Sequence, residues 1–120
     1  MNHVLVVDDD RAIVSTVQAV LVDEGYDVAT AADGREALAE LRREMPSLVL
    51  LDMRMPVMDG WHFAEEVKQQ GIAVPIVVMT AAQDARRWAN EIGANGYVSK
   101  PFDIEDLLEV VATHRHQHEH

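Results

Sequence analysis

Four short apolar runs, each followed directly by polar or charged residues, limit the possible folds of this chain more than any other feature. Each run has the length of a buried strand, and the stretches between the runs carry the three- and four-residue spacing of helices. Strands that alternate with helices pair in parallel, through right-handed crossovers, in one sheet. The runs and the residues that follow them are Val4–Val7 with Asp8-Asp9-Asp10, Leu48–Leu51 with Asp52, Ile76–Met79 with Thr80, and Tyr97–Ser99 with Lys100-Pro101.

The remaining segments complete an α/β pattern of five strands and five helices. A further strand is predicted at Tyr26–Thr30, and Pro46 breaks the chain before the third strand. Pro56, Asp59 and Gly60 indicate a loop after Asp52. The first predicted helix has apolar residues that recur from Ile13 to Leu21, and Gly25 stops it. The other predicted helices are one opened by the capping box Asp33-Gly34-Arg35-Glu36, Trp61–Gln70, one from Asp84 to about Gly93, and one opened by Asp103.

Composition excludes several classes of function. The chain has 120 residues and 48% hydrophobic residues, which is enough for one domain with a real core. A net charge of −11 argues against nucleic acid or an anionic membrane as a direct partner and favours a cation. The absence of cysteine excludes disulfides and thiolate metal sites. No secretion signal and no apolar run of about 20 residues is present, so we expect a cytoplasmic protein.

The last seven residues, His114–His120, are rich in histidine at alternate positions. We place the domain at residues 1–113 and interpret residues 114–120 as a frayed or vector-derived terminus. Adventitious binding of a transition metal is the alternative interpretation. No effector domain follows the last helix, so we expect either a single-domain protein or one part of a larger one.

The strand ends bring together carboxylates that repel one another. Polar groups at the carboxyl ends of parallel strands meet at one edge of the sheet. Three carboxylates within about 4–5 Å repel by a few kcal/mol per pair, so the cluster formed by Asp8, Asp9 and Asp52 calls for a counter-ion. An all-oxygen site suits Mg²⁺. Asp8 and Asp9 point in alternate directions and must differ in role, whereas Asp10 is better explained as a helix cap.

The same edge offers groups suited to phosphoryl chemistry. A carboxylate next to Mg²⁺ can act as a nucleophile toward phosphorus, and the transferred group needs cationic and hydroxyl donors. Lys100 supplies an ammonium and Thr80 a small hydroxyl. Each could be ordinary alone, Lys100 as a surface lysine and Thr80 as a β-branched strand residue. Their joint placement at successive strand ends favours a common site.

From Val4 to about Thr113, the chain resembles a response-regulator receiver domain of two-component signalling. The resemblance is carried by Asp8-Asp9, the segment Leu51–Gly60, Thr80-Ala81 and Lys100-Pro101-Phe102, in the family's order and spacing. It implies a flavodoxin-like fold with strand order 2-1-3-4-5 and helices on both faces. In that order the ligand crevice lies between the first and third strands, which end in Asp8-Asp9 and Asp52.

The resemblance also implies roles for individual residues. Asp52 would accept the phosphoryl group, and Asp8, Asp9, Asp52 and the backbone carbonyl of Arg54 would bind Mg²⁺. Lys100 would contact the acidic pocket and the phosphoryl group, Thr80 would turn inward to hydrogen-bond it, and a cis peptide would precede Pro101. The domain would catalyse its own phosphorylation and dephosphorylation without turning over a metabolite. Its partners would be a sensor histidine kinase or phosphotransfer protein and an unidentified downstream protein, with no nucleic acid bound by this domain alone and no membrane.

Five further residues carry expectations that concern switching, phosphoryl lifetime or partner contacts. Tyr97 matches the family's aromatic switch residue, which would reshape the surface of the fourth helix, fifth strand and fifth helix, but it could equally be a half-buried strand tyrosine. Arg54 and Ala82 match positions that tune phosphoryl lifetime. Trp61 and Trp88 are more often packing than partner contacts, and Trp88 is the better candidate for a partner contact.

Two other classes of protein fit less well. A Mg²⁺-dependent phosphohydrolase needs an acid two residues after its nucleophile, where this chain has Arg54. A flavin or nucleotide carrier needs a glycine-rich loop after the first strand, where this chain has Asp8-Asp9-Asp10. A receiver-like protein that binds partners without phosphorylation is a third alternative, but the acceptor set is complete.

Overall fold

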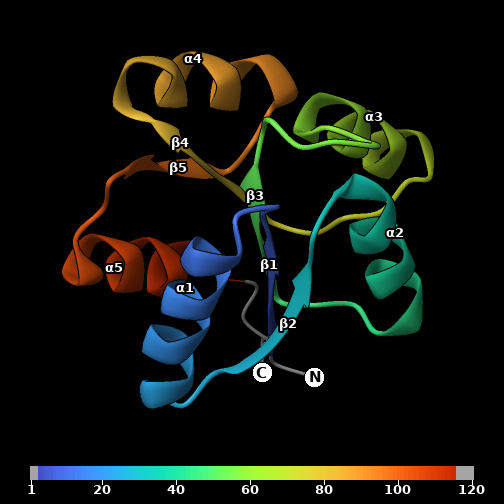
Figure 1. The fold of residues 1–120 in the computed structure, drawn as a ribbon. Helices are drawn as coiled ribbons and strands as arrows, with labels where there is room; N and C mark the ends of the chain where they lie inside the picture. Colours follow the sequence, from blue (N-terminus) through green and yellow to red (C-terminus); the bar gives the residue numbers. More distant parts are fainter. Residues whose placement is uncertain (1–2, 116–120) are drawn as a thin grey trace.

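The computed structural model describes residues 3–115 as one parallel sheet of five strands with the order β2-β1-β3-β4-β5 (Figure 1). The predicted α/β class, strand order and alternation of strands and helices are confirmed. The strands are β1 (His3–Val7), β2 (Asp27–Ala31), β3 (Leu48–Asp52), β4 (Ile76–Ala81) and β5 (Gly96–Lys100). The helices are α1 (Arg11–Asp23), α2 (Gly34–Arg43), α3 (Gly60–Gln69), α4 (Ala82–Ile92) and α5 (Ile104–His114).

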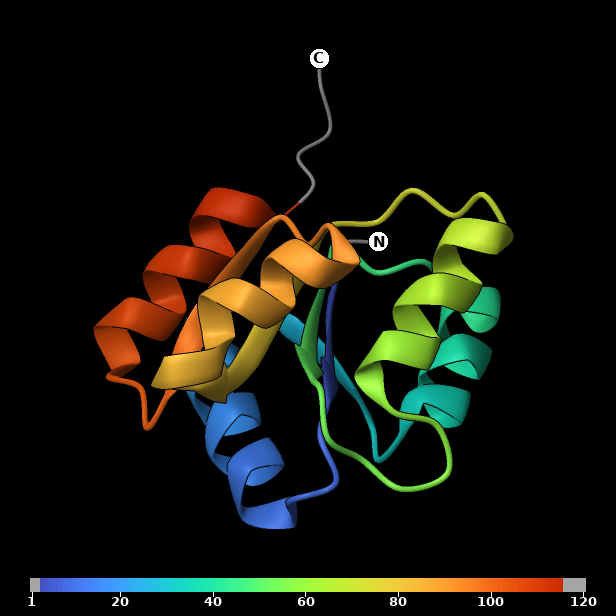
Figure 2. The same ribbon diagram turned by 90° about the horizontal axis from the view of Figure 1, so that it is seen from above.

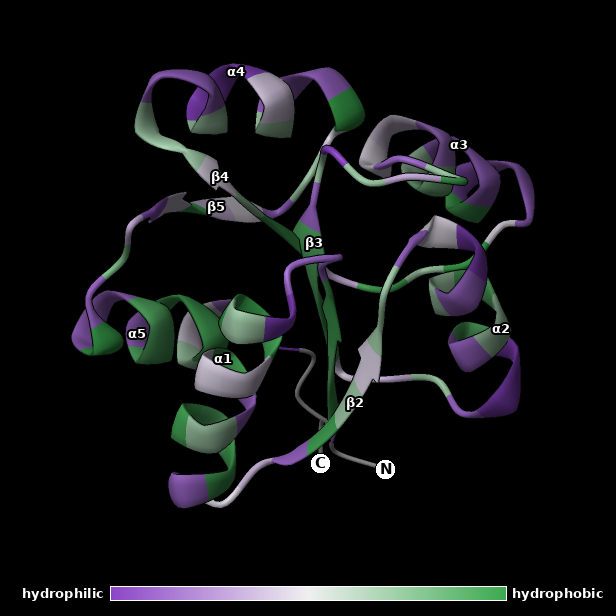
Figure 3. Ribbon diagram, viewed as in Figure 1, coloured by the Kyte–Doolittle hydropathy of each residue, from purple (hydrophilic) through white to green (hydrophobic). Residues whose placement is uncertain are grey.

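Helices cover both faces of the sheet, with α1 and α5 on one face and α2, α3 and α4 on the other (Figures 1 and 2). Successive strand residues point to opposite faces, so the sheet feeds two hydrophobic clusters. On β1, Val4 and Val6 pack toward α1 and α5, while Leu5 and Val7 pack toward α2, α3 and α4. Figure 3 shows the central strands in hydrophobic green and helices in which hydrophilic and hydrophobic segments alternate. Burial on both faces explains the continuous apolar runs.

Aspartate side chains accept capping hydrogen bonds at the start of three helices, α1, α2 and α3. Asp10 accepts hydrogen bonds from the amides of Ala12 and Ile13, which confirms it as the cap of α1. Asp33 accepts from the amide of Glu36 and so caps α2, as the capping box predicts. The return bond differs from the usual box, because the carboxylate of Glu36 accepts from the amide of Ala32.

Two helix starts differ from the sequence prediction. Asp59 was assigned to the loop, but it caps α3, which therefore begins at Gly60. Asp84 does not open α4: the helix begins at Ala82, and Asp84 lies in its first turn. The cap residue of α4 is Ala81, which makes no side-chain hydrogen bond, so the capping signal that the prediction sought is missing. Gly93 ends α4 in the left-handed conformation, as predicted.

The C-terminal boundary also shifts. His114 is the last residue of α5, although it was placed in the tail, and its ring fills the space beside Gly96. The guanidinium of Arg115 lies 5.5 Å from the centre of the Tyr26 ring. The rest of the predicted tail, residues 116–120, lies outside the described residues. Within residues 3–115, no helix combines the length and apolar character needed to cross a bilayer.

Val57 occupies a strained position in the loop between β3 and α3. Its φ is 69°, a left-handed conformation that is costly for a β-branched residue. The amide of Met58 donates to the carbonyl of Pro56 at 2.7 Å and closes a tight three-residue turn around Val57. Because Val57 is 75% exposed, packing offsets little of this strain.

We expect Val57→Gly to raise the free energy of unfolding by about 1 kcal/mol, because glycine adopts a positive φ without steric cost. Urea denaturation measures the change. Val57→Ala keeps the Cβ atom and is the matched control, which should gain little. Equal stability of the two variants would contradict strain at this residue.

Candidate functional site

The strand register brings Asp8, Asp52 and Lys100 to one edge of the sheet. Val7, which precedes Asp8, pairs with Leu51, which precedes Asp52, so the two aspartates lie level at the ends of adjacent strands. Lys100 ends β5 and pairs with Ala81 at the end of β4. These three residues follow the strand positions that face α1 and α5, so their side chains share one side of the sheet.

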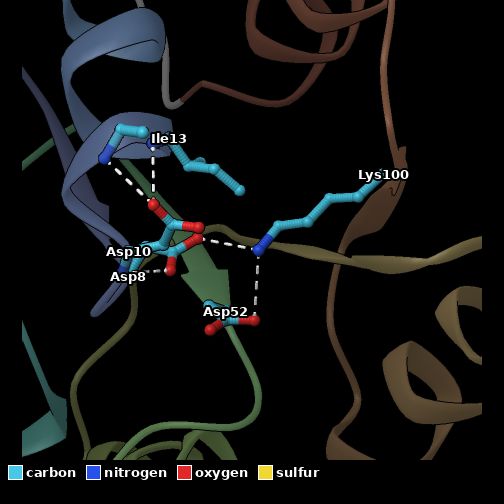
Figure 4. A network of polar contacts seen from close by, with 6 residues as sticks. Asp8, Asp10, Ile13, Asp52 and Lys100 are labelled. Atoms are coloured by element: carbon cyan, nitrogen blue, oxygen red, sulfur yellow. Dashed lines mark hydrogen bonds and ion pairs between the residues drawn. The ribbon is translucent and has the colours of Figure 1, made fainter.

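Lys100 bridges the two buried aspartates (Figure 4). Its Nζ donates to Oδ2 of Asp8 at 2.8 Å and to Oδ1 of Asp52 at 3.4 Å. Asp8 is 2% exposed and Asp52 is 7% exposed. The other oxygen of Asp8 accepts from the amide of Asp10 at 2.9 Å, which fixes the carboxylate at the start of α1. The ammonium therefore holds both carboxylates in place.

Burial dominates the electrostatics of Asp52. It raises the pKa of Asp52 to about 6, with further increases from the charges of Asp8 and Asp9 and an opposing effect from Lys100. Burial also acts to lower the pKa of Lys100, but its hydrogen bond to Asp8 and the charges of Asp52 and Asp8 outweigh this effect and raise that pKa. Asp52 thus protonates more readily than an ordinary aspartate when no cation is bound.

The metal-free domain should therefore lose stability as pH rises from about 4 to above 6. The folded state holds a proton on Asp52 that the unfolded chain releases at its lower pKa, so rising pH favours the unfolded chain across that window. Urea denaturation in EDTA at several pH values measures this dependence. Asp52→Asn should flatten the curve between the two pKa values, and an unchanged curve in that variant would contradict the elevated pKa.

The donor set fits a divalent cation. Asp8, Asp9 and Asp52 each offer one carboxylate oxygen, and these oxygens lie within 4.8 Å of one another. Asp9 is exposed while Asp8 is buried, so the two side chains lie in different environments. Three carboxylates and one ammonium leave two negative charges, which a dication balances. These oxygen donors suit Mg²⁺. Because Asp9 is exposed, a bound ion can keep part of its water shell, as Mg²⁺ usually does.

Thr80, Tyr97 and Pro101 lie outside the cluster of carboxylates and Lys100. Thr80 is buried at the end of β4, and within residues 3–115 its hydroxyl makes no hydrogen bond to Asp52. It follows Ile76 and Val78, which face α2, α3 and α4, so it lies on the other side of the sheet from Lys100. Tyr97 is 44% exposed on β5. The peptide bond between Lys100 and Pro101 is cis.

Residues 4–112 match the family model described as the response regulator receiver domain. The chain belongs to this family. Receiver domains are the regulated modules of two-component signalling systems, which agrees with the edge of acidic residues and lysine described above. The resemblance stated from the sequence is confirmed.

Curated relatives and solved structures agree with this family. The chain is 41% identical over 108 residues to the alkaline phosphatase synthesis transcriptional regulatory protein PhoP of Bacillus subtilis, a match that covers 88% of this chain and 45% of PhoP. Chemotaxis protein CheY4 of Vibrio cholerae is 38% identical with a TM-score of 0.84, covering 94% of this chain and 98% of CheY4. The receiver domain of NtrX from Brucella abortus is 32% identical with a TM-score of 0.84, covering 92% and 95%. The chain spans about half the length of the curated relatives it matches.

The receiver domain's two tryptophans lie together, and Trp88 is not a surface residue. Trp88 is only 5% exposed, which overturns its choice as the better candidate for a partner contact. Its ring meets the ring of Trp61 edge to face, with centroids 4.9 Å apart and planes at 68°. The spacing of Ala85, Trp88 and Ala89, all buried on α4, is the signal that places Trp88 in the core.

Sequence reasoning also missed two contacts of the receiver domain, one in the loop after β3 and one at the start of α3. The guanidinium carbon of Arg54 lies 5.1 Å from the centre of the Trp88 ring. His62 was given no chemistry, but its Nδ1 lies 2.8 Å from Oδ1 of Asp59, and its amide donates to the same oxygen. The hydrogen bond and charge of Asp59 raise the pKa of His62. The three-residue separation of Asp59 and His62 could have predicted this pair, whereas no local signal predicts the contact between Arg54 and Trp88.

Proposed function

We propose that this receiver domain is a phosphorylation-dependent switch that accepts a phosphoryl group on Asp52. The donor is a phosphohistidine of a sensor kinase or phosphotransfer protein. The observation that carries the proposal is the bridge formed by Lys100 between Asp8 and Asp52, beside carboxylate oxygens of Asp8, Asp9 and Asp52 that gather within 4.8 Å. Buried carboxylates so close together are costly unless a cation neutralises them, and groups with such perturbed electrostatics are typical of functional sites.

Asp8, Asp9, Asp52 and the backbone carbonyl of Arg54 would hold Mg²⁺ at this edge. The bound ion would offset negative charge on both Asp52 and the oxygens of the incoming phosphoryl group. Asp8 is fixed by Lys100 and by the amide of Asp10, so it offers a rigid ligand. Asp9 is exposed and suits a ligand that acts directly or through water.

The transfer itself is a substitution at phosphorus. A carboxylate oxygen of Asp52 forms the new bond to phosphorus, the bond between phosphorus and the histidine nitrogen breaks, and that nitrogen keeps the electron pair. Lys100 already lies within 3.4 Å of Asp52, so its ammonium can follow the charge onto the phosphoryl oxygens. The products are an acyl phosphate on Asp52 and a free histidine.

The output depends on groups around the acceptor. Thr80 turns inward to hydrogen-bond the phosphoryl group, and Tyr97 packs into the space that Thr80 leaves. The surface of α4, β5 and α5 changes as a result and is read by a downstream protein. Activity is self-modification, including dephosphorylation, without turnover of a metabolite.

The composition of the chain and its relatives support a location and an output for this switch. We place the domain, whose last helix ends at His114, in the cytoplasm, with no membrane contact and no nucleic acid bound by this domain alone, in line with its charge of −11. PhoP of Bacillus subtilis is named a transcriptional regulatory protein, so gene regulation through a longer protein is one output that this receiver could serve.

Chemical trapping locates the phosphoryl group. The protein is incubated with acetyl phosphate and Mg²⁺, and the acyl phosphate is reduced with borohydride, which converts a phosphorylated aspartate to homoserine. Peptide mass spectrometry should find homoserine at residue 52 and at no other aspartate. Homoserine at Asp8 or Asp9, or its absence from the whole chain, would refute Asp52 as the acceptor.

A further inference from the structure

Arg54 links the acceptor loop to helix α4 through an aromatic ring. It lies two residues after Asp52, and its guanidinium carbon is 5.1 Å from the centre of the Trp88 ring. This geometry is a cation–π contact. Arg54 is exposed and makes no ion pair among the described residues. The interaction that the structure shows for its charge is therefore the contact with the ring of Trp88.

The contact continues into a chain that joins three segments. The edge-to-face contact of Trp61 with Trp88 connects α3 to α4. The indole nitrogen of Trp61 donates to Oε1 of Glu91 at 3.0 Å, which ties the same two helices a second time. The start of α4 has no side-chain cap, so these tryptophan contacts contribute to holding the helix in position.

We propose that Arg54 transfers from the face of Trp88 to the phosphoryl group on Asp52, and that this transfer loosens the packing of α4 against α3. The inference rests on the proposed function, because it requires phosphorylation of Asp52. β3 ends at Asp52 and the chain bends at Met53, so Arg54 lies in the loop just past the strand end, where strand alternation no longer fixes the side of its side chain. Its Cα atom lies at most about 7 Å from that of Asp52, a distance that an extended arginine side chain spans. Arg54 is therefore within reach of an anion on Asp52.

The balance of forces favours the transfer. A guanidinium forms two parallel, charge-assisted hydrogen bonds with phosphoryl oxygens, which are stronger than a cation–π contact at an exposed site. Once Arg54 leaves, the face of Trp88 that it covered is open, and the indole environment changes. Phosphorylation thereby acts on α4 through Arg54 and Trp88, on the opposite side of the sheet from Lys100.

The indole N–H signals of the two tryptophans give a direct NMR test. Trp61→Phe and Trp88→Phe assign the two signals. Beryllofluoride with Mg²⁺ serves as the phosphoryl mimic, and fluorine NMR reports whether it is bound. In the wild-type protein, binding should shift the Trp88 signal. In Arg54→Gln, the free protein should already show a displaced Trp88 signal, and the shift on adding beryllofluoride should be lost.

Arg86→Gln is the matched control, because Arg86 is an exposed arginine of α4 and loses the same charge. It should retain the wild-type Trp88 signal in both states. An unmoved Trp88 signal in free Arg54→Gln, or an unmoved signal in wild-type protein that has bound beryllofluoride, overturns this inference alone. Failure of the wild-type protein to bind beryllofluoride overturns the proposed function as well.

Discussion

Asp52→Asn is expected to abolish phosphorylation by acetyl phosphate. An amide nitrogen or oxygen is a far weaker nucleophile than a carboxylate, and the substitution also removes one of the three charges that favour a dication. Intact-mass spectrometry of the variant with Mg²⁺ should show no increase by one phosphoryl group. The wild-type protein, treated in parallel, should show a single addition.

The same substitution should stabilise the metal-free domain at neutral pH. It removes a buried charge that burial and Asp8 both disfavour, although it also removes a partner of Lys100. We expect a gain of about 1–2 kcal/mol in EDTA, which raises the midpoint of thermal unfolding by several degrees. Asp23→Asn, at an exposed aspartate of α1, is the control for loss of one negative charge. A phosphorylated Asp52→Asn protein would contradict the assignment.

Lys100→Met should slow phosphorylation about 100-fold, the usual effect of removing one donor that stabilises developing charge. Methionine keeps much of the aliphatic stem but lacks the ammonium that contacts Asp8 at 2.8 Å and Asp52 at 3.4 Å. The rate is measured from the growth of the phosphoryl adduct at fixed Mg²⁺ and acetyl phosphate.

Removal of this ammonium should also leave Asp8 and Asp52 without their counter-charge. We expect a loss of about 2 kcal/mol in EDTA, which Mg²⁺ partly restores. Lys68→Met, at an exposed lysine of α3, is the control and should match the wild-type protein in rate and stability. Phosphorylation of Lys100→Met at the wild-type rate would show that Lys100 has no part in the transfer.

Local signals in the sequence predicted most of the fold. The runs Val4–Val7 and Leu48–Leu51 are buried throughout, and this is why they lack the alternation of a half-exposed strand. Asp10 and Asp33 cap helices through their own neighbours, which a sequence pattern can reveal. The predicted start of α4 at Asp84 was wrong because Ala81, the cap residue of this helix, has no side chain that can accept a hydrogen bond.

The sequence also predicted that the polar groups at the strand ends converge at one edge of the sheet, since parallel strands present their carboxyl ends together. These groups are Asp8, Asp9, Asp52 and Lys100. The contact of Arg54 with Trp88 could not, because it joins residues from different elements and depends on how α4 packs on the sheet. The side of the sheet on which Thr80 lies follows from strand register, which only the structure supplies.

The central claim is that the clustered carboxylates hold a cation that enables Asp52 to react. The dependence of phosphorylation on Mg²⁺ tests this claim most directly. The measurement is the initial rate of adduct formation by intact-mass spectrometry, with acetyl phosphate held constant and Mg²⁺ varied from excess EDTA to saturation. The account predicts no adduct in EDTA and a rate that saturates as one site fills. Formation of the adduct on Asp52 at the same rate in EDTA would contradict it.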